Sequence, residues 1–302
     1  MIEVSESNSD EIITWDWNRA GRLHYWYARF DVSDEWVVRQ VERNLAGPKD
    51  GTLTTFNVLE DGEDVGYLVL AEEPQLQATI YDLWVVPEHR RRGVGTAMRK
   101  WAEDWAKSRA KSLFVNIDPR DRGLRALFAS YPTRARTMMK RLAKPASLPG
   151  GVEGRPMTEA RFETWVNAST QVYADEIFAS GSMSREDAMA RAVRSTEELL
   201  PDGVHTAGHT FWSVFHGEAE VGTNWLRHHH DPNVSFVYAV ESHEAFRGKG
   251  YGRAAMIVGE HASRAAGDTH IGLNVFGHNA AAIALYKRLG YRPIDDYRSI
   301  DL

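Results

Sequence analysis

The chain has 302 residues, of which 43% are hydrophobic and 26% charged, and its formal net charge is −6. The composition is that of an ordinary globular protein, and the length favours two domains of about 150 residues each. The acidic balance argues against a general nucleic-acid surface, the absence of cysteine excludes disulfides and thiolate chemistry, and no apolar run is long enough to span a membrane. Because residues 1–20 are acidic and polar, without the apolar core of a signal peptide, we expect a cytoplasmic protein.

In the first half, residues 33–47 predict a helix with Ser33 as its N-cap and Gly47 near its C-terminal end. Three strand-like runs follow, and Asp61–Gly62 predicts a turn between the first two. A glycine-rich loop, a helical run and an apolar strand come next. These expected elements are the strands 52–60, 64–72 and 78–86, the loop 89–95, the helix 96–110 and the strand 112–117.

A stretch rich in glycine and proline, residues 144–156, lies near the middle of the chain. It follows a basic segment, residues 134–144, for which we expect a solvated face rather than a nucleic-acid site. We therefore predict a first domain over residues 1–145, a linker over 146–155 and a second domain over 156–302.

The second half repeats the same order of elements. Ser184 predicts the N-cap of a helix over residues 183–200, with Asp187 three positions later as in a capping box. Gly217–Glu218 predicts a turn between the next two strands. The remaining expected elements are the strands 209–216, 220–228 and 234–242, the loop 246–252, the helix 253–267 and the strand 270–276.

The spacing of matching residues indicates an internal repeat. Arg247 lies 157 positions after Arg90, and Tyr286 lies 158 positions after Phe128. A nearly constant offset together with the same order of elements predicts a tandem duplication.

A basic glycine-rich loop follows the third strand of each half, HRRRGVG at residues 89–95 and FRGKGYG at residues 246–252. Free backbone N–H groups at a helix start, glycines that allow close approach and basic side chains together favour the phosphates of a diphosphate ligand. The second loop also matches the GxGxxA pattern of dinucleotide-binding folds, but the first does not, because Met98 stands at its last position. A plain strand-to-helix turn with solvated arginines is the other alternative.

Both loops share the pattern R-x-x-G-x-G, which resembles the acyl-CoA loop of the GNAT superfamily of N-acetyltransferases. Residues 83–95 resemble the strand-and-loop signature of that family, L-x-V-x-P-x-x-R-x-x-G-x-G. Residues 274–291 resemble its closing signature, N-x-x-A-x-x-L-Y-x-x-x-G-F/Y. The tandem arrangement is similar to that of mycothiol synthases.

The resemblance implies an α/β (α+β) fold with two tandem GNAT-like domains, each a mixed, mostly antiparallel, splayed sheet with helices on both faces. It also implies acetyl-CoA as cosubstrate, bound in the splay along the strand before the loop, and no metal. The residues that would bind it are Val85, Arg90, Arg91, Arg92, Gly93, Val94 and Gly95 in the first half and Val240, Ser242, Arg247, Gly248, Lys249, Gly250, Tyr251, Gly252 and Asn279 in the second.

The two halves differ where the chemistry would occur. By resemblance, Tyr286 is the general acid that protonates the departing CoA thiolate, and a phenol suits that role. Phe128, at the matching position of the first half, has no proton to give, and Asp121 replaces Asn279. We therefore expect the second domain to be catalytic and the first to be degenerate.

The general base is expected on the strand before the second loop. Glu241 shares one face of that strand with Ala239, because side chains alternate along a strand. A solvated carboxylate at the strand end is the alternative for Glu241, and His243 and Glu244 are lesser candidates for the base.

These residues predict an acyl-CoA-dependent N-acyltransferase that moves acetyl from acetyl-CoA to a primary amine of a small molecule or peptide in a ternary complex. The alternatives are a non-catalytic acyl-CoA-binding or interaction module and, more narrowly, an acetyltransferase similar to mycothiol synthase. We expect no nucleic-acid or membrane partner, and a monomer or homodimer.

Two further patterns carry weaker expectations. In the run RHHHDP, residues 227–232, His228 and His230 would share a strand face, but no further ligand stands at metal-binding spacing, so we expect a solvated hairpin tip. For the aromatic residues between Trp15 and Tyr27 we expect core packing rather than a substrate pocket.

Overall fold

The computed structural model describes residues 2–73, 77–144, 146–179 and 183–302. The chain forms two compact units, the first composed of Met1–Arg136 with Ile294–Leu302 and the second of Thr137–Pro293. The C-terminal segment Ile294–Leu302, which the sequence placed in the second domain, thus belongs to the first unit.

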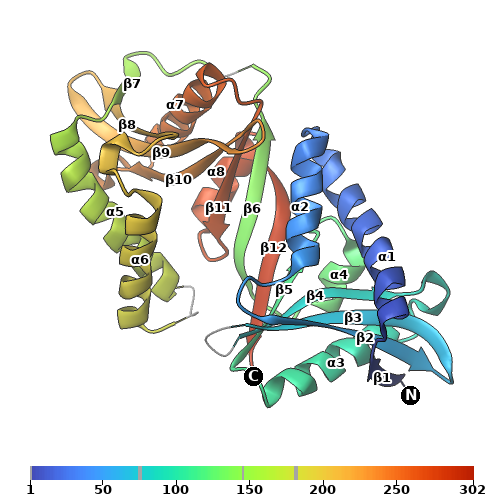
Figure 1. Cartoon of the computed structure of the whole chain (residues 1–302). Helices are drawn as coiled ribbons and strands as arrows, with labels where there is room; N and C mark the ends of the chain where they lie inside the picture. The colour runs from blue at the N-terminus through green and yellow to red at the C-terminus, as the bar shows by residue number, and fades with distance from the viewer. Residues whose placement is uncertain (1, 74–76, 145, 180–182) are drawn as a thin grey trace. The chain divides into compact units, whose positions relative to one another are not determined.

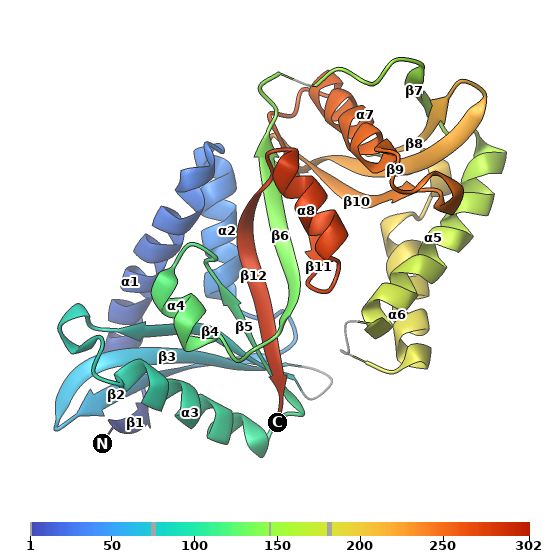
Figure 2. The ribbon, with the colours of Figure 1, turned by 180° about the vertical axis from the view of Figure 1, so that it is seen from behind.

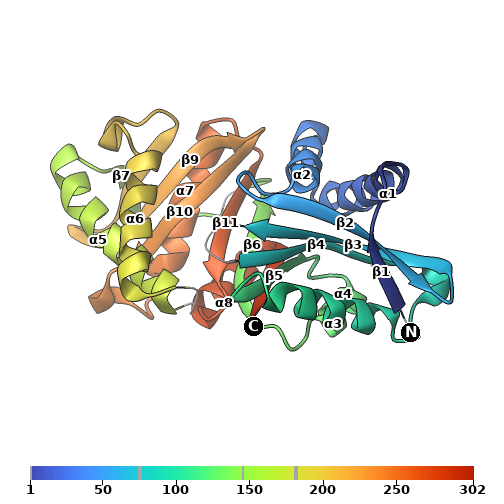
Figure 3. The ribbon, with the colours of Figure 1, turned by 60° about the horizontal axis from the view of Figure 1, so that its bottom comes forward.

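The first unit contains a mixed sheet with helices on both of its faces. Its elements are β1 (Ile2–Glu6), α1 (Ser9–Tyr27), α2 (Asp34–Ala46), β2 (Thr52–Glu60), β3 (Glu63–Glu73), β4 (Gln77–Val85), α3 (Val94–Lys107), β5 (Ser112–Ile117), α4 (Arg122–Leu127) and β12 (Arg292–Asp301). The strand order is β1-β2-β3-β4-β5-β12; β4 and β5 pair in parallel, and the other neighbours pair antiparallel. Figure 3 shows α1 and α2 on one face of this sheet and α3 and α4 on the other.

The second unit repeats this architecture. Its elements are β7 (Val152–Pro156), α5 (Glu159–Ala179), α6 (Arg185–Leu199), β8 (His209–His216), β9 (Ala219–Asp231), β10 (Val234–Ser242), α7 (Tyr251–Ala265), β11 (His270–Phe276) and α8 (Ala280–Arg288). The strand order is β11-β10-β9-β8-β7, and β10 and β11 form the parallel pair. Helices α5 and α6 cover one face, and α7 and α8 cover the other (Figures 1 and 2). The predicted fold class is confirmed.

The parallel pair of each sheet separates part-way along its length. The pairing of β4 with β5 extends from Gln77 to Ile80, and that of β10 with β11 extends from Val234 to Val237. Beyond the last pair, β4 continues to Val85 and β10 continues to Ser242. Each sheet is therefore splayed, as the family resemblance implied, and the splay exposes one backbone edge of β4 and of β10.

Local sequence signals are confirmed where they concern caps and turns. The Trp36 backbone N–H donates to the Ser33 hydroxyl at 3.3 Å, and the Asp187 N–H donates to the Ser184 hydroxyl at 3.1 Å. Asp61 and Gly62 both have positive φ, 56° and 82°, as a two-residue hairpin turn requires. These features depend on a few neighbouring residues, and so the sequence alone predicts them.

The basic segment at residues 134–144 differs from its prediction. Most of it is strand β6 (Thr133–Arg141), along which the boundary between the two units falls. Met138 is fully buried, and the Lys140 ammonium lies 2.7 Å from the buried Glu260 carboxylate. The expectation of a solvated face was therefore wrong, because the apolar residues between the charges make this segment a core strand.

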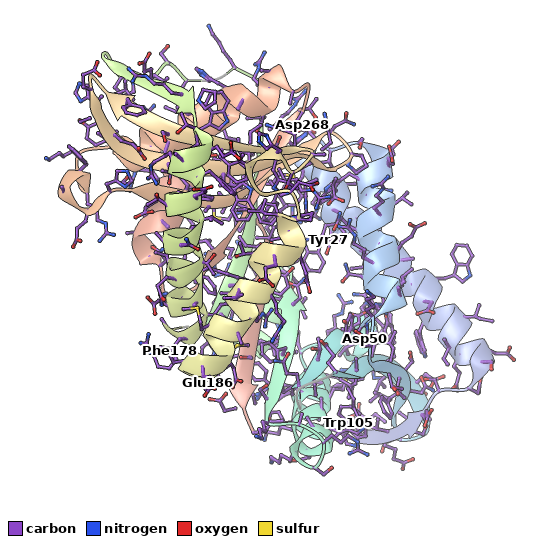
Figure 4. The ribbon with its side chains drawn as sticks, turned by 60° about the vertical axis from the view of Figure 1, so that its left-hand side comes forward. Tyr27, Asp50, Trp105, Phe178, Glu186 and Asp268 are labelled. Carbon is purple, nitrogen blue, oxygen red and sulfur yellow. The ribbon has the colours of Figure 1, made fainter. Side chains whose placement is uncertain are left out.

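The histidine run also differs from its prediction. His228 and His230 lie within β9 rather than in a solvated hairpin tip. The His228 ring lies 2.9 Å from the Thr210 hydroxyl and 3.0 Å from the Ser235 hydroxyl, and His229 pairs at 2.8 Å with Asp268, which Figure 4 labels. Across residues 2–73, 77–144, 146–179 and 183–302, no group of three or more His, Asp or Glu side chains could hold a metal ion.

The N-terminal aromatic residues divide between core and surface. Tyr27 is buried, and Trp15 stacks on Tyr67 with ring centroids 4.8 Å apart, as core packing requires. Trp17 is 78% exposed instead, so the expectation holds for only part of this set. Within the described part of the chain, no helix is both long and apolar enough to cross a membrane.

Candidate functional site

A β-bulge precedes the splay in each unit. The register of β10 against β9 shifts between Val237 and Ala239, and that of β4 against β3 shifts between Ile80 and Asp82. A bulge bends its strand and increases the local twist, and here it coincides with the last parallel pair. The residues after the bulge can therefore form backbone hydrogen bonds with an extended ligand, as an open strand edge does.

A glycine on the neighbouring strand supports the end of this edge. A Cβ atom at Gly222 would lie 2.3 Å from the Glu241 carbonyl oxygen, and one at Gly66 would lie 2.1 Å from the Trp84 carbonyl oxygen. Only glycine permits this approach between the two backbones. The position of Glu241 thus depends on Gly222, which lies outside both family signatures found in the sequence.

The second glycine-rich loop leads directly into α7. Gly248 and Gly250 have φ of 76° and 87°, and Gly250 is the N-cap of α7, where no side chain of the described residues caps the helix. The backbone N–H groups of the first turn can therefore bind an anion. The first loop has the same start, because Gly93, with φ of 92°, is the N-cap residue of α3 and offers no capping side chain.

The two loops differ in how their basic side chains are placed. Arg90 donates from Nε to the Val85 carbonyl oxygen at 2.8 Å and lies over the Trp84 ring, whereas Lys249 donates to the Ala245 carbonyl oxygen at 3.3 Å. The Val94 side chain is buried in the core of the first unit, so only its backbone faces the loop. The remaining predicted loop side chains, Arg91, Arg92 and Arg247, are exposed.

Gly252 brings three predicted parts of the site together. A Cβ atom there would lie 3.1 Å from the Ser242 hydroxyl and 3.4 Å from the Leu285 side chain. The loop, the end of β10 and helix α8 therefore meet at this glycine. Tyr251, the preceding residue, places its hydroxyl 2.5 Å from Nδ1 of His216.

Tyr286 lies on α8 beside the splay. It is 7% exposed and belongs to the buried cluster that includes Val237 and Leu273. Burial raises the pKa of Tyr286 to about 12, and the nearby Glu176 carboxylate adds to the rise. The phenol therefore keeps its proton throughout the neutral range. Asn279 caps α8, since its side-chain oxygen accepts from the Ala282 N–H at 3.1 Å.

Phe128 occupies the corresponding place in the first unit. Asp121 caps α4 by accepting from the Leu124 N–H at 2.9 Å, and Phe128 is the C-cap residue of the same helix. The Phe128 ring is fully buried and packs edge-on against Tyr131 at 5.2 Å. Helix capping is thus common to both units, whereas the second unit alone has a phenol at this place.

A cavity of about 560 Å³ opens between α5 and the end of β10 in the second unit. Two of its lining residues, Glu241 and His243, lie two positions apart, so they project from the same face of the chain where it is extended. The others come from one side of α5. The lining residues are Ala160, Arg161, Thr164, Trp165, Ala168, Glu241 and His243.

A charged network lies against this cavity. Arg161 donates to both carboxylate oxygens of Glu220, from Nε at 2.9 Å and from Nη2 at 2.8 Å, and Nε2 of His243 lies 3.2 Å from the same carboxylate. Burial favours a higher pKa for Glu220, but the hydrogen bonds and charges of Arg161 and His243 outweigh it and lower that pKa. Glu220 is therefore ionised at neutral pH.

The corresponding region of the first unit is filled by packed side chains. Trp84 stands where the second unit has Glu241, and its ring lies 6.0 Å from that of Trp15 and 5.8 Å from that of Tyr67. The Tyr67 hydroxyl donates to Asp82 at 2.8 Å, and Arg22 pairs with the same carboxylate. The first unit therefore lacks both the carboxylate predicted as the base and the phenol predicted as the acid.

Three residues near the site belong to no motif that could have been recognised in the sequence. Arg161 and Glu220 are brought to the cavity by α5 and β9, and Glu176 on α5 interacts with His278 and Asn279 at the start of α8. Burial raises the pKa of Glu176, although these two partners oppose the rise. These residues are far apart in the sequence, so only the fold shows that they belong together.

Comparison with known proteins gives a consistent result. The family model described as "Acetyltransferase (GNAT) family" matches residues 11–130 and 174–291. The chain is 32% identical over 138 residues to the uncharacterized N-acetyltransferase YdgE of Bacillus subtilis, covering 45% of this chain and 88% of the relative. It is 27% identical over 262 residues to a mycothiol acetyltransferase of Streptomyces scabiei, covering 81% and 78%.

Among solved structures, the chain is similar to a GCN5-related N-acetyltransferase from Sphaerobacter thermophilus. The TM-score is 0.56 at 19% identity, and the match covers 100% of this chain and 98% of the other. At this identity the likeness concerns the fold, and it extends over both units.

Proposed function

Because this chain belongs to the acetyltransferase (GNAT) family and is an N-acetyltransferase, we propose that its second unit transfers the acetyl group of acetyl-CoA to a primary amine of a small molecule or peptide. One observation carries the assignment to this unit. Glu241, near the end of β10, lines the cavity, and the buried phenol of Tyr286 packs with residues of the splayed strands β10 and β11. The first unit has Trp84 and Phe128 at these two positions.

Acetyl-CoA would bind along the open edge of β10. The backbone of Val240 and Ser242 would pair with the pantetheine arm, and the diphosphate would contact the first turn of α7. The N-cap glycine of α7 and the positive φ of the loop glycines support this placement. The loop residues proposed to contact it are Arg247, Gly248, Lys249, Gly250, Tyr251 and Gly252, with Asn279 at the start of α8.

The reaction we propose is direct attack in a ternary complex. Glu241 accepts a proton from the ammonium form of the acceptor, and the free amine attacks the thioester carbonyl carbon. The C–N bond forms, the C–S bond breaks, and backbone N–H groups at the bulge stabilise the developing oxyanion. As the C–S bond breaks, the attacking nitrogen loses its second proton to the departing sulfur, so the products are the amide and the CoA thiol.

Tyr286 would stabilise the departing sulfur. With its pKa raised to about 12, the phenol is a weaker acid than an ordinary thiol, so complete transfer to a free thiolate is uphill. The buried phenol can instead donate a hydrogen bond to the sulfur, and this bond strengthens as the C–S bond breaks. Tyr286 would in this way act as a hydrogen-bond donor to the departing sulfur.

A second function is proposed for the first unit, as an acyl-CoA-binding module without catalysis. It has the splayed edge and the positive-φ Gly93 at the start of α3, but Phe128 has no proton to give. Val85, Arg90, Arg91, Arg92, Gly93, Val94 and Gly95 would form its binding loop. A narrower alternative for the whole chain is acetylation in mycothiol chemistry, which the similarity to mycothiol acetyltransferases supports.

The proposal is tested by CoA release from acetyl-CoA with benzylamine, spermidine, glucosamine and glycylglycine as acceptors. We expect turnover with at least one of these amines, and a matching acetylated product by mass spectrometry. Calorimetry of CoA with the full chain and its Arg247→Glu and Arg90→Glu variants assigns binding to each loop. If none of these amines supports turnover, the proposal that the enzyme acetylates a primary amine of a small molecule or peptide is contradicted.

A further inference from the structure

The network beside the cavity contains an imidazole that the proposed reaction does not yet use. His243 follows β10 directly, and its backbone N–H donates to the Val221 carbonyl oxygen at 3.0 Å. Its ring lines the same cavity as Glu241 and contacts the Glu220 carboxylate. The ring is therefore held in place by its backbone and by one ionised partner.

The partner fixes the tautomer of this ring. An ionised carboxylate can only accept hydrogen bonds, so Nε2 of His243 carries the hydrogen that faces Glu220. Nδ1 of the neutral ring then carries the lone pair. Arg161 holds Glu220 through two of its nitrogens, which keeps the carboxylate ionised and oriented. The arrangement is a base whose orientation depends on a second residue, a recurring feature of proton-transfer sites.

From this geometry we propose that His243 receives the proton that Glu241 removes from the acceptor ammonium and releases it to solvent, with Glu220 and Arg161 as positioning residues. This role rests on the proposed function of the cavity. Glu241 and His243 line the same cavity, so water within it can carry the proton from one side chain to the other. A protonated carboxyl group can donate its hydrogen, and the free lone pair on Nδ1 of His243 can accept it.

The proton balance is complete without another reactant. The ammonium loses one proton to the Glu241 carboxylate, the carboxylic acid passes it to Nδ1 of His243, and the imidazolium releases it to bulk water. The positive charge on the ring faces Glu220 during this step. The His243 side chain is 29% exposed, so it has a route to solvent.

The first unit has no histidine at the position that corresponds to His243. Glu11 is the residue of α1 that corresponds to Arg161, and Val86 corresponds to His243. Asn57 there donates to Asp64 at 2.6 Å and to Glu11 at 3.3 Å, which makes a network of carboxylates and an amide in place of one with an imidazole. The imidazole therefore occurs in the unit that also has Tyr286.

The test compares the wild type with His243→Ala and Glu220→Gln in the full chain, with the exposed His205→Gln as control. With an amine that the wild type acetylates, we expect His243→Ala to lower kcat by about a hundredfold or more and added imidazole to restore part of it. Glu220→Gln should lower kcat without rescue, because its imidazole is still present. His205→Gln should match the wild type.

Each result decides the role. An unchanged kcat in His243→Ala would overturn it, and so would a loss that imidazole does not restore, since that indicates a structural role. Absence of turnover in the wild type would instead refute the proposed function, and this role with it. A ¹⁵N spectrum of the histidine rings gives a readout without any acceptor, in which His243 is expected as the Nε2–H tautomer; the other tautomer would contradict the proposal.

Discussion

Tyr286 and Phe128 stand at the same separation in sequence from the residues that cap their helices, Asn279 and Asp121. Both rings are buried beside the splay of their own sheet. The pair therefore differs in chemistry but not in position. This difference makes the second unit the place to test for catalysis.

Replacing Tyr286 by Phe removes the phenol and keeps the ring. We expect kcat to fall by about 10²- to 10⁴-fold, while the KM for acetyl-CoA changes little, because the ring packing is retained. Steady-state kinetics of CoA release measures both constants. The exposed Tyr25→Phe is the control and should behave as the wild type. A Tyr286→Phe enzyme with normal kcat would exclude a role for this phenol in stabilising the departing sulfur.

The pH dependence of the reaction should have no alkaline limb from this phenol below about pH 10. Burial raises the pKa of Tyr286 to about 12, and the active form is the protonated one, which is present at every pH below that value. Activity should therefore be lost only as the pH approaches 12. A pH profile of kcat for the wild type checks this, and a loss centred near pH 8 that disappears in Tyr286→Phe would contradict it.

Filling the cavity should weaken acceptor binding. Ala168 lines the cavity, and the corresponding residue of the first unit, Asn18, accepts a hydrogen bond from the Tyr67 hydroxyl at 3.4 Å. In Ala168→Trp we expect the KM for the amine to rise by at least about tenfold, which is about 1.4 kcal/mol, with an unchanged KM for acetyl-CoA. Asn167→Trp, which changes the neighbouring exposed residue, is the matched control. Equal effects of the two substitutions would place the acceptor elsewhere.

Acidification should destabilise the second unit through His209. Burial lowers the pKa of His209 to about 4, and the charges of Arg227 and two histidines add to the effect. Trp225 donates from its indole nitrogen to Nδ1 of this ring at 2.8 Å, so the folded protein holds it neutral. The unfolded chain takes up the proton near pH 6.5, and the folded one only near pH 4.

The free energy of unfolding should therefore fall as the pH drops from about 6.5 to 4, by up to about 3 kcal/mol. Urea unfolding at several pH values measures the change. In His209→Gln, whose side-chain oxygen can still accept from Trp225, the fall should be smaller. If His209→Gln and the wild type lose stability equally over this window, another group is responsible.

Arg91 should be less favourable than glycine at its position. Its φ is 66°, in the left-handed region, and Gly248 has φ of 76° at the matching place. An L-residue in this region costs about 1–2 kcal/mol, partly offset by the greater entropy that glycine loses on folding. Arg91→Gly should therefore stabilise the protein by up to about 1 kcal/mol, and Gly248→Ala should destabilise it. Urea unfolding without CoA measures both, and opposite signs would refute the argument.

The sequence by itself determined the repeat, the helix caps, the hairpin turns and the positions of Tyr286 and Phe128. All of these depend on residues close together in the chain or on a spacing repeated between the halves. The loop glycines belong to the same class, because positive φ is a local requirement that few other residues meet.

Only the tertiary structure decided which distant segments complete each unit and the cavity. Ile294–Leu302 packs with the first unit, where Asp296 to Asp301 pair with β5, although no local pattern distinguishes this strand's partner. Arg161, Glu220 and His243 meet because α5, β9 and the end of β10 come together at one place. Strand pairing and charge networks are formed between residues far apart in the chain, so their partners are set by packing rather than by local sequence.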